Sequence, residues 1–190
     1  RSLQEQGHWP WRRDLLAQMV HEVLQRQQVA VLGFDVLFSE ADTSSGLPVL
    51  RELAQGPLRD QPGFAEELAR LTPHLDFDAR FAAAVHKQPV VLGFYFTSDR
   101  QGHTRGVLPA PVMGADAMQG RAVRLLSWTG CGANVAALAE AAPQAGFFNS
   151  VTDADGMVRS IPLLARFQGQ YYESLALAVF RRLSGLPEVR

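Results

Sequence analysis

The chain has 190 residues, enough for one domain with a substantial core, and its hydrophobic content of 47% is that of a folded globular protein. Its 18 basic and 19 acidic residues nearly cancel, so no net charge draws it to nucleic acid or to an anionic membrane surface. The apolar runs are too short to span a bilayer. Because the first residue is not Met, we expect a piece of a longer protein. The single cysteine, Cys131, excludes an internal disulfide and a thiolate zinc site, and it fits either the cytosol or the periplasm.

The first part of the chain is predicted to be a helix followed at once by a strand. Residues 10–28 carry apolar side chains in pairs four residues apart, and Pro10 suits a first helical turn. The strand follows in residues 29–38, with the sequence VAVLGFDVLF. Its almost continuous apolar character indicates a strand that is covered on both faces.

The same order of helix and strand returns twice. Residues 76–88 predict a helix capped by Asp76 or Asp78, and residues 89–96 predict its strand. In the third unit Asn134 is a candidate helix cap, Pro143 ends the helix, and a short strand closes on Phe147 and Phe148.

Two irregular regions, about 43–75 and about 97–130, interrupt this order within a single domain spanning residues 1–190. The first contains Ser, Gly and Pro and one short predicted helix, FAEELARL, so we interpret it as an elaborated crossover. The second is rich in Gly and Pro.

The C-terminal part has antiparallel character. The sequence DADG, residues 153–156, predicts a tight turn between FFNSV and MVRSIPLLARF. An amphipathic helix follows in residues 173–185, with Ser174 as its cap and Gly185 as its stop. The pattern predicts an α/β fold: a three-layer sandwich with a mostly parallel central sheet and an antiparallel C-terminal addition.

Candidate functional residues lie where the predicted strands end, because open α/β sheets bind ligands at the carboxyl ends of their parallel strands. We expect a small polar ligand there, and the residues predicted to contact it are Asp35, Glu40, Asp42, Asn149, Asp153 and Arg159. Each has a structural alternative. Asp35 can hold a turn or an arginine, Glu40 and Asp42 can solvate a loop, and Arg159 can fix Asp153 or Asp155.

Other motifs do not predict catalysis, a cofactor or a metal. DADG fails as a calcium loop because residue 162 is Pro where the pattern needs Glu. WTGCGAN is a Gly-rich loop before a helix whose amides could cradle an anion, but no Lys-Ser/Thr follows. The five histidines have no metal-ligand spacing, and Trp9 and Trp11 are interpreted as a packing plug.

Several segments, in order, resemble the second type of CHASE domain. RSLQEQGHWPWRR resembles the opening box of that family, and VAVLGFDVLFSEAD resembles its most distinctive strand and turn. DARFAAAV is similar to its D-x-x-[LF]-A-x-A helix. GFFNSVTDADGMVRSIPLL and ESLALAVF are similar to its Asn/Asp/Arg box and its closing helix. The resemblance covers almost the whole chain except residues 43–75 and 97–130.

The resemblance implies a sensor rather than an enzyme. Domains of this family lie outside the membrane, in the periplasm or extracellular space, as parts of adenylate cyclases, serine/threonine kinases and histidine kinases of two-component systems. The expected partners are therefore flanking transmembrane helices, a cytoplasmic output domain, an unknown small polar ligand and a second copy in a homodimer, with no nucleic acid. Two alternatives remain open at this point: a metal-assisted hydrolase that uses strand-end carboxylates, and a dimerisation module without a ligand.

Overall fold

A computed structural model of the chain describes residues 7, 9–118, 125–153 and 155–189. Its central sheet contains β1 (Leu32–Phe34), β2 (Val90–Thr97), β3 (Thr104–Arg105), β5 (Gly130–Gly132) and β6 (Ala145–Phe147). β1 and β6 run parallel to β2 on its two sides, since Leu92 pairs with Phe34 in one and with Ala145 in the other. β5 runs antiparallel to the end of β2, and β3 runs parallel to β5.

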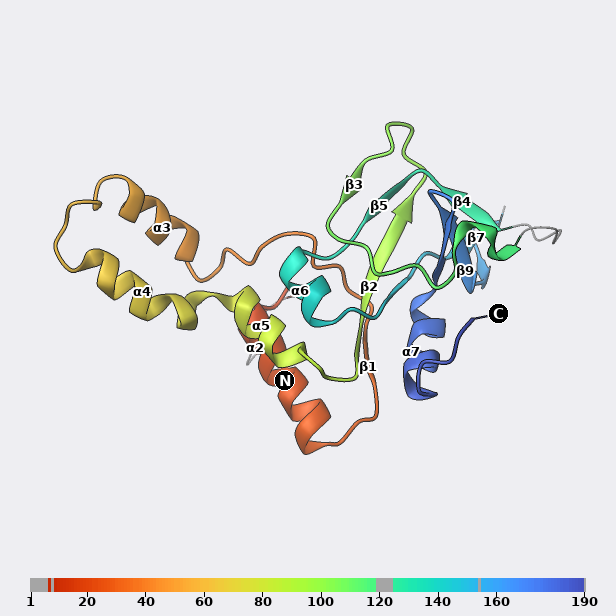
Figure 1. Cartoon of the computed structure of the whole chain (residues 1–190), viewed down its shortest axis with the longest axis horizontal. Helices are drawn as coiled ribbons and strands as arrows, with labels where there is room; N and C mark the ends of the chain where they lie inside the picture. Colours follow the sequence, from red (N-terminus) through yellow and green to blue (C-terminus); the bar gives the residue numbers. More distant parts are fainter. Residues whose placement is uncertain (1–6, 8, 119–124, 154, 190) are drawn as a thin grey trace.

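Helices cover both faces of this sheet (Figure 1). Neighbouring residues of a strand point to opposite faces, and Gly33 and Phe34 in β1 show which helices belong to each. Phe34 packs in a buried cluster with α2 (Arg13–Val20), the π-helical segment His21–Arg26, α5 (Phe77–Val85) and α6 (Ala136–Ala141). Gly33 lies under Val179 of α7 (Leu175–Leu183), which therefore covers the other face. The prediction of a three-layer α/β sandwich with a mostly parallel sheet is confirmed.

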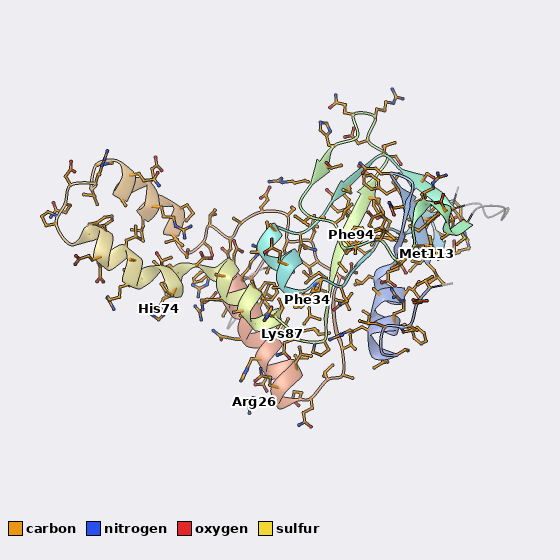
Figure 2. The ribbon with its side chains drawn as sticks, in the orientation of Figure 1. Arg26, Phe34, His74, Lys87, Phe94 and Met113 are labelled. Carbon is orange, nitrogen blue, oxygen red and sulfur yellow. The ribbon has the colours of Figure 1, made fainter. Side chains whose placement is uncertain are left out.

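A second buried cluster joins the central sheet to the C-terminal strands. β4 (Leu126–Trp128), β9 (Leu164–Phe167) and β10 (Gln170–Glu173) form a small sheet, and β7 (Val151–Thr152) pairs with β8 (Val158–Ser160). Phe94 and Phe96 of β2 lie edge-on to Tyr172 of β10, at ring distances of 6.2 and 5.6 Å. Phe34 and Phe94, one from each cluster, are labelled in Figure 2.

The crossover after β1 contains two helices, α3 (Leu47–Gln55) and α4 (Phe64–Leu75), which extend away from the sheet in Figure 1. Only α4 was predicted. The signal for α3 is Pro48 in its first turn, preceded by Gly46 at a left-handed φ of 74°. A short 3₁₀ helix, η2 (Ala115–Met118), lies in the second irregular region.

Local predictions of caps and turns are largely confirmed. Asp76 accepts a hydrogen bond from the Ala79 amide at 2.9 Å, and Ser174 accepts one from the Leu177 amide at 3.3 Å. Gly156 has a φ of 83° in the connection between β7 and β8, as a tight turn requires. Pro10, however, precedes the first helix, which begins at Arg13.

The interpretation of WTGCGAN as a Gly-rich loop is wrong for its glycines, because Gly130–Gly132 is strand β5. Its glycines are explained by close packing. A Cβ on Gly132 would lie 2.6 Å from the Tyr95 ring, and one on Gly130 would lie 2.5 Å from the His103 carbonyl. No helix within the described residues is long and apolar enough to cross a bilayer.

Candidate functional site

A cleft of about 360 Å³ lies between the segment before α2 and the loop that follows β1. One wall is formed by residues 9–13 and the other by residues 36–44. The lining residues are Trp9, Pro10, Trp11, Arg12, Arg13, Val36, Leu37, Phe38, Ala41, Asp42, Thr43 and Ser44. The lining combines apolar side chains with a few polar ones, as is usual for sites that bind small molecules.

The aromatic wall of the cleft is open to solvent. Trp9 is 52% exposed, and its ring meets Trp11 edge to face with the ring centres 6.0 Å apart. The indole N–H of Trp11 donates to the carbonyl of Gly7 at 3.1 Å. Trp9 therefore forms a solvent-exposed wall of the cleft, where the sequence suggested a packing plug.

Arg13 is a buried charge beneath the cleft. Its guanidinium donates to a carboxylate oxygen of Asp78 and to the carbonyl of Glu40, and it lies 5.3 Å from the Phe38 ring centre. Burial lowers the pKa of Arg13, and the charge of Asp42 opposes that effect. The side chain thus joins α2, the loop after β1 and α5 at one point.

Asp42 fixes the same junction from the other side. Its Oδ2 accepts the backbone N–H of Arg13 at 2.8 Å, and its Oδ1 accepts the Ser44 amide at 2.9 Å and the Ser44 hydroxyl at 2.5 Å. Burial raises the pKa of Asp42, but the hydrogen bonds from Ser44 and Arg13 outweigh it, and the net shift is downward. α2 has no cap from its own N-cap residue, so Asp42 satisfies a free amide of its first turn from 29 residues away.

A neighbouring group of charges ties α2 to α5. Arg12 donates two hydrogen bonds to the buried carboxylate of Asp14, at 3.1 and 2.8 Å, and Arg80 approaches that carboxylate at 3.8 Å. The guanidinium carbons of Arg12 and Arg80 lie 4.9 and 5.9 Å from the ring centre of Phe77. A movement of residues 9–13 would therefore be passed directly to α5.

The wall contributed by the loop after β1 is positioned by Asn134. This residue is 2% exposed, and its Oδ1 accepts the Phe38 amide at 3.0 Å while its Nδ2 donates to the Gly93 carbonyl at 2.9 Å. The Val135 amide donates to the Phe38 carbonyl at 2.8 Å. β1 pairs with the first part of β2 and β5 pairs with its last part. The Asn134 side chain bonds to Gly93 of β2, in the gap between these two strands. The sequence indicated it only as a helix cap, and the cap position belongs to Val135.

The predicted ligand contacts separate into different places. Only Asp42 of the six lines the cleft; Glu40 adjoins it, with its backbone on Arg13 and its exposed carboxylate 2.9 Å from Arg105. Asp153 and Arg159 form an exposed ion pair at 2.9 Å on the β7–β8 hairpin, and Arg159 also binds Asp155 at 2.7 Å. These partners raise the pKa of Arg159.

The remaining two predicted residues lie elsewhere again. Asn149 pairs its amide with the backbone N–H and carbonyl of Phe96, both at 2.8 Å, and so continues the sheet beside β2. Asp35 lines a separate groove beside α7, and its side chain forms no hydrogen bond or ion pair with any described residue. The alternative that it holds a turn or an arginine therefore finds no support among these residues. The groups that do meet at the cleft, Arg13 and Asp78, were not predicted, because their contact depends on tertiary packing.

The described residues form no group of three or more His, Cys, Asp or Glu side chains with the arrangement of a metal site. Asp35 stands without the neighbouring acids that the hydrolase alternative needs. Cys131 is buried, and burial raises the pKa of its thiol, opposite to what a nucleophilic cysteine requires.

The comparison with protein families gives one result. The model of the CHASE2 domain matches residues 1–188, which is nearly the whole chain. Searches among curated proteins and among solved structures gave no match. The CHASE2 family comprises extracellular sensory domains of signal-transduction receptors, and this chain belongs to that family.

Proposed function

We propose that this chain is the ligand-sensing part of a membrane-anchored receptor and that it binds a small polar ligand in the cleft between residues 9–13 and residues 36–44. It lies outside the cytoplasm, performs no catalysis itself and passes its signal to a cytoplasmic cyclase or kinase. Membership of the CHASE2 family supports the sensory role. The ligand and the attached output domain are part of the proposal.

The observation that carries the proposal is the construction of the cleft from two segments joined by Arg13 and Asp42. A ligand that pushes these segments apart, or draws them together, changes the hydrogen bonds of Arg13 to Asp42, Asp78 and Glu40. Since Asp78 lies in α5, the change reaches the helical layer of the sandwich. Binding would in this way select between two arrangements of the chain.

A thermal-shift screen of the chain with small metabolites, ions and peptides tests the site. Hits should lose their effect in Trp9→Ala, which removes an exposed wall of the cleft, and keep it in Val49→Ala, an equally exposed apolar residue on α3. Hits that depend instead on Asp35 or Asp153, tested as Asp35→Ala and Asp153→Ala, would move the site away from the cleft.

The receptor part of the proposal has a separate test. The complete reading frame around residues 1 and 190 should encode transmembrane helices and, after them, a cyclase or kinase. A continuation without membrane-spanning segments would contradict the proposal whatever the result of the screen.

A further inference from the structure

The cleft between residues 9–13 and residues 36–44 has two walls of different chemistry. On one wall the rings of Trp9 and Trp11 lie 6.0 Å apart with their planes inclined at 63°. On the other wall lies Asp42, which is half-buried. The volume of about 360 Å³ is near the lower end of the range of about 300–1,000 Å³ for small-molecule sites, so the cleft suits a compact ligand.

Many hydrogen-bond donors that line the cleft are already used within the protein. Those that donate to protein acceptors are the backbone amides of Arg13, Phe38, Asp42 and Ser44, the Ser44 hydroxyl and the guanidinium groups of Arg12 and Arg13. Most of their acceptors are carboxylates, which hold such donors strongly. An anionic ligand would have to displace them, so the chemistry of the cleft does not favour an anion.

The charges beneath the cleft leave one carboxylate without a paired cation. Arg12 donates two hydrogen bonds to Asp14, and Arg13 donates to Asp78. Asp42 accepts only from backbone amides and one hydroxyl, and it forms no ion pair with any described residue. Two carboxylates therefore lie near the single guanidinium of Arg13, and the charge of Asp42 remains available to a ligand.

Aromatic rings opposite a carboxylate of this kind are features by which proteins bind organic cations. The face of an indole ring carries negative charge density and attracts a cation that lies within about 6 Å of the ring centre. Asp42 adds a full negative charge on the opposite wall, and its half-burial limits the screening of that charge by water. A compact cation between the walls therefore meets favourable charge on both sides.

The hydrogen bonds of Asp42 distinguish between kinds of cation. Its oxygens already accept three hydrogen bonds, of the roughly four that a carboxylate can accept. A primary ammonium carries three N–H donors, each of which needs an acceptor, whereas a trimethylammonium group carries none and requires only negative charge and aromatic surface. A metal ion needs several oxygen ligands, and the described residues contain no group of three or more His, Cys, Asp or Glu suited to one.

We propose that the cleft binds a trimethylammonium group, held between the indole rings of Trp9 and Trp11 and the carboxylate of Asp42. This inference rests on the proposed function and specifies the chemistry of its ligand. Since the indoles and the carboxylate belong to different walls, the cation draws residues 9–13 and residues 36–44 together. The group belongs either to a free compound such as choline or to the headgroup of phosphatidylcholine, which share this chemistry.

Isothermal titration calorimetry of the chain with four compounds, up to about 10 mM, tests the proposal. Choline and tetramethylammonium should bind. Ethanolamine, whose ammonium carries N–H donors, and the neutral analogue of choline in which carbon replaces nitrogen should each bind at least about tenfold more weakly. Equal binding of choline and its neutral analogue, or no binding of either quaternary cation, overturns the proposal. These comparisons use the wild-type chain, so they do not depend on whether a variant folds.

Variants of the two walls test the residues. Trp9→Leu keeps an apolar side chain without an aromatic ring and should weaken choline binding by about threefold to thirtyfold, whereas Trp9→Tyr should stay within about threefold of wild type. Asp42→Asn removes the charge and should weaken binding by about tenfold or more. Val49→Leu, at an apolar residue 59% exposed on α3, should leave the Kd unchanged. Circular dichroism of each variant confirms that the fold is retained.

Two results separate this inference from the proposed function. An anionic or neutral hit of the thermal-shift screen that is lost in Trp9→Ala, with no binding of choline, overturns the trimethylammonium proposal and leaves the ligand cleft in place. Choline binding that is unchanged in Trp9→Leu and Asp42→Asn but lost in Asp35→Ala overturns both.

Vesicles of phosphatidylcholine identify the source of the group. Cosedimentation of the chain with them that choline displaces and Trp9→Leu weakens supports the proposal with the lipid headgroup as ligand. Choline binding without cosedimentation supports it with a free compound as ligand.

Discussion

Arg13 and Asp78 form a buried ion pair that joins the beginnings of α2 and α5, although 65 residues separate them in the sequence. Their side chains are 8% and 18% exposed. Asp78 also accepts the amide of Asp42 at 2.9 Å, so both walls of the cleft depend on it. The pair is therefore a structural support of the candidate site as well as a link between it and the helical layer.

Asp78→Asn should lower the free energy of unfolding by up to about 3–5 kcal/mol, because it removes the carboxylate to which the buried Arg13 guanidinium donates and leaves Asp42 as the remaining acid beside it. Urea denaturation measures the change. Glu67→Gln is the matched control, since its ion pair with Arg70 is exposed on both sides and should contribute less than about 1 kcal/mol. Equal losses in the two variants would show that the Arg13–Asp78 pair has no special role.

The depressed pKa of Asp42 predicts a loss of stability in acid. A group whose folded pKa lies below its unfolded value stabilises the fold above the unfolded value, and this stability is lost as the pH falls through the folded one. For Asp42 the unfolded value is near 3.8 and the folded value is lower, so the loss begins as the pH falls toward 4 and continues below it.

Asp42→Asn should therefore flatten the fall of the urea midpoint between about pH 5 and pH 3, although it lowers the midpoint at pH 7. Ser44→Ala, which removes one hydrogen bond to Asp42, should give an intermediate slope. The prediction fails if the Asp42→Asn curve runs parallel to that of the wild type over this range.

Asn134 and Asn149 offer a second matched comparison, because each pairs its amide with backbone beside β2. Asn134 is 2% exposed, whereas Asn149 is half-buried. Asn134→Ala leaves the Phe38 amide and the Gly93 carbonyl without partners in the interior, which costs about 1–3 kcal/mol for each buried group.

Asn149→Ala frees the backbone of Phe96, but water can replace the lost amide there, so the loss should be smaller. Urea denaturation of the two variants ranks them. Asn134→Asp should not recover the loss, since it cannot donate to the Gly93 carbonyl and would bury a carboxylate without a counter-ion. The reverse order of stability would contradict the bridging role assigned to Asn134.

The sequence predicts the elements that depend on local spacing. The helix and strand periods, the caps at Asp76 and Ser174 and the turn before Gly156 all follow from residues within one or two turns of each other. Contacts between segments that are distant in the chain could not be predicted from the sequence. The partners of Asn134 lie 41 and 96 residues away in Gly93 and Phe38, and nothing in a single sequence pairs such positions.

The candidate site shows the same limit. Strand-end polarity pointed to Asp42, which lines the cleft, but it also pointed to Asp35, Asp153 and Arg159, which lie in other places. β1 is only three residues long and β2 is eight, so their carboxyl ends do not share one rim. The glycines of β5 suggested a loop for a related reason. They are required by close packing against Tyr95 and His103, which depends on tertiary structure, and not by a loop.

Glycine also determines how closely α7 approaches the sheet, and this gives the last prediction. A Cβ on Gly146 would lie 2.5 Å from both the Cα and the backbone N of Leu175, closer than any side-chain adjustment can relieve. Gly146→Ala should push the start of α7 away from β6 and lower the free energy of unfolding by about 1–3 kcal/mol or more.

Gly114→Ala is the control, because a Cβ there meets nothing within 4 Å and the backbone φ is not left-handed. It should be neutral or raise stability by up to about 1 kcal/mol, since alanine restricts the unfolded chain. If Gly146→Ala were as stable as the control, α7 would not be held at the distance from the sheet that the glycine contacts require.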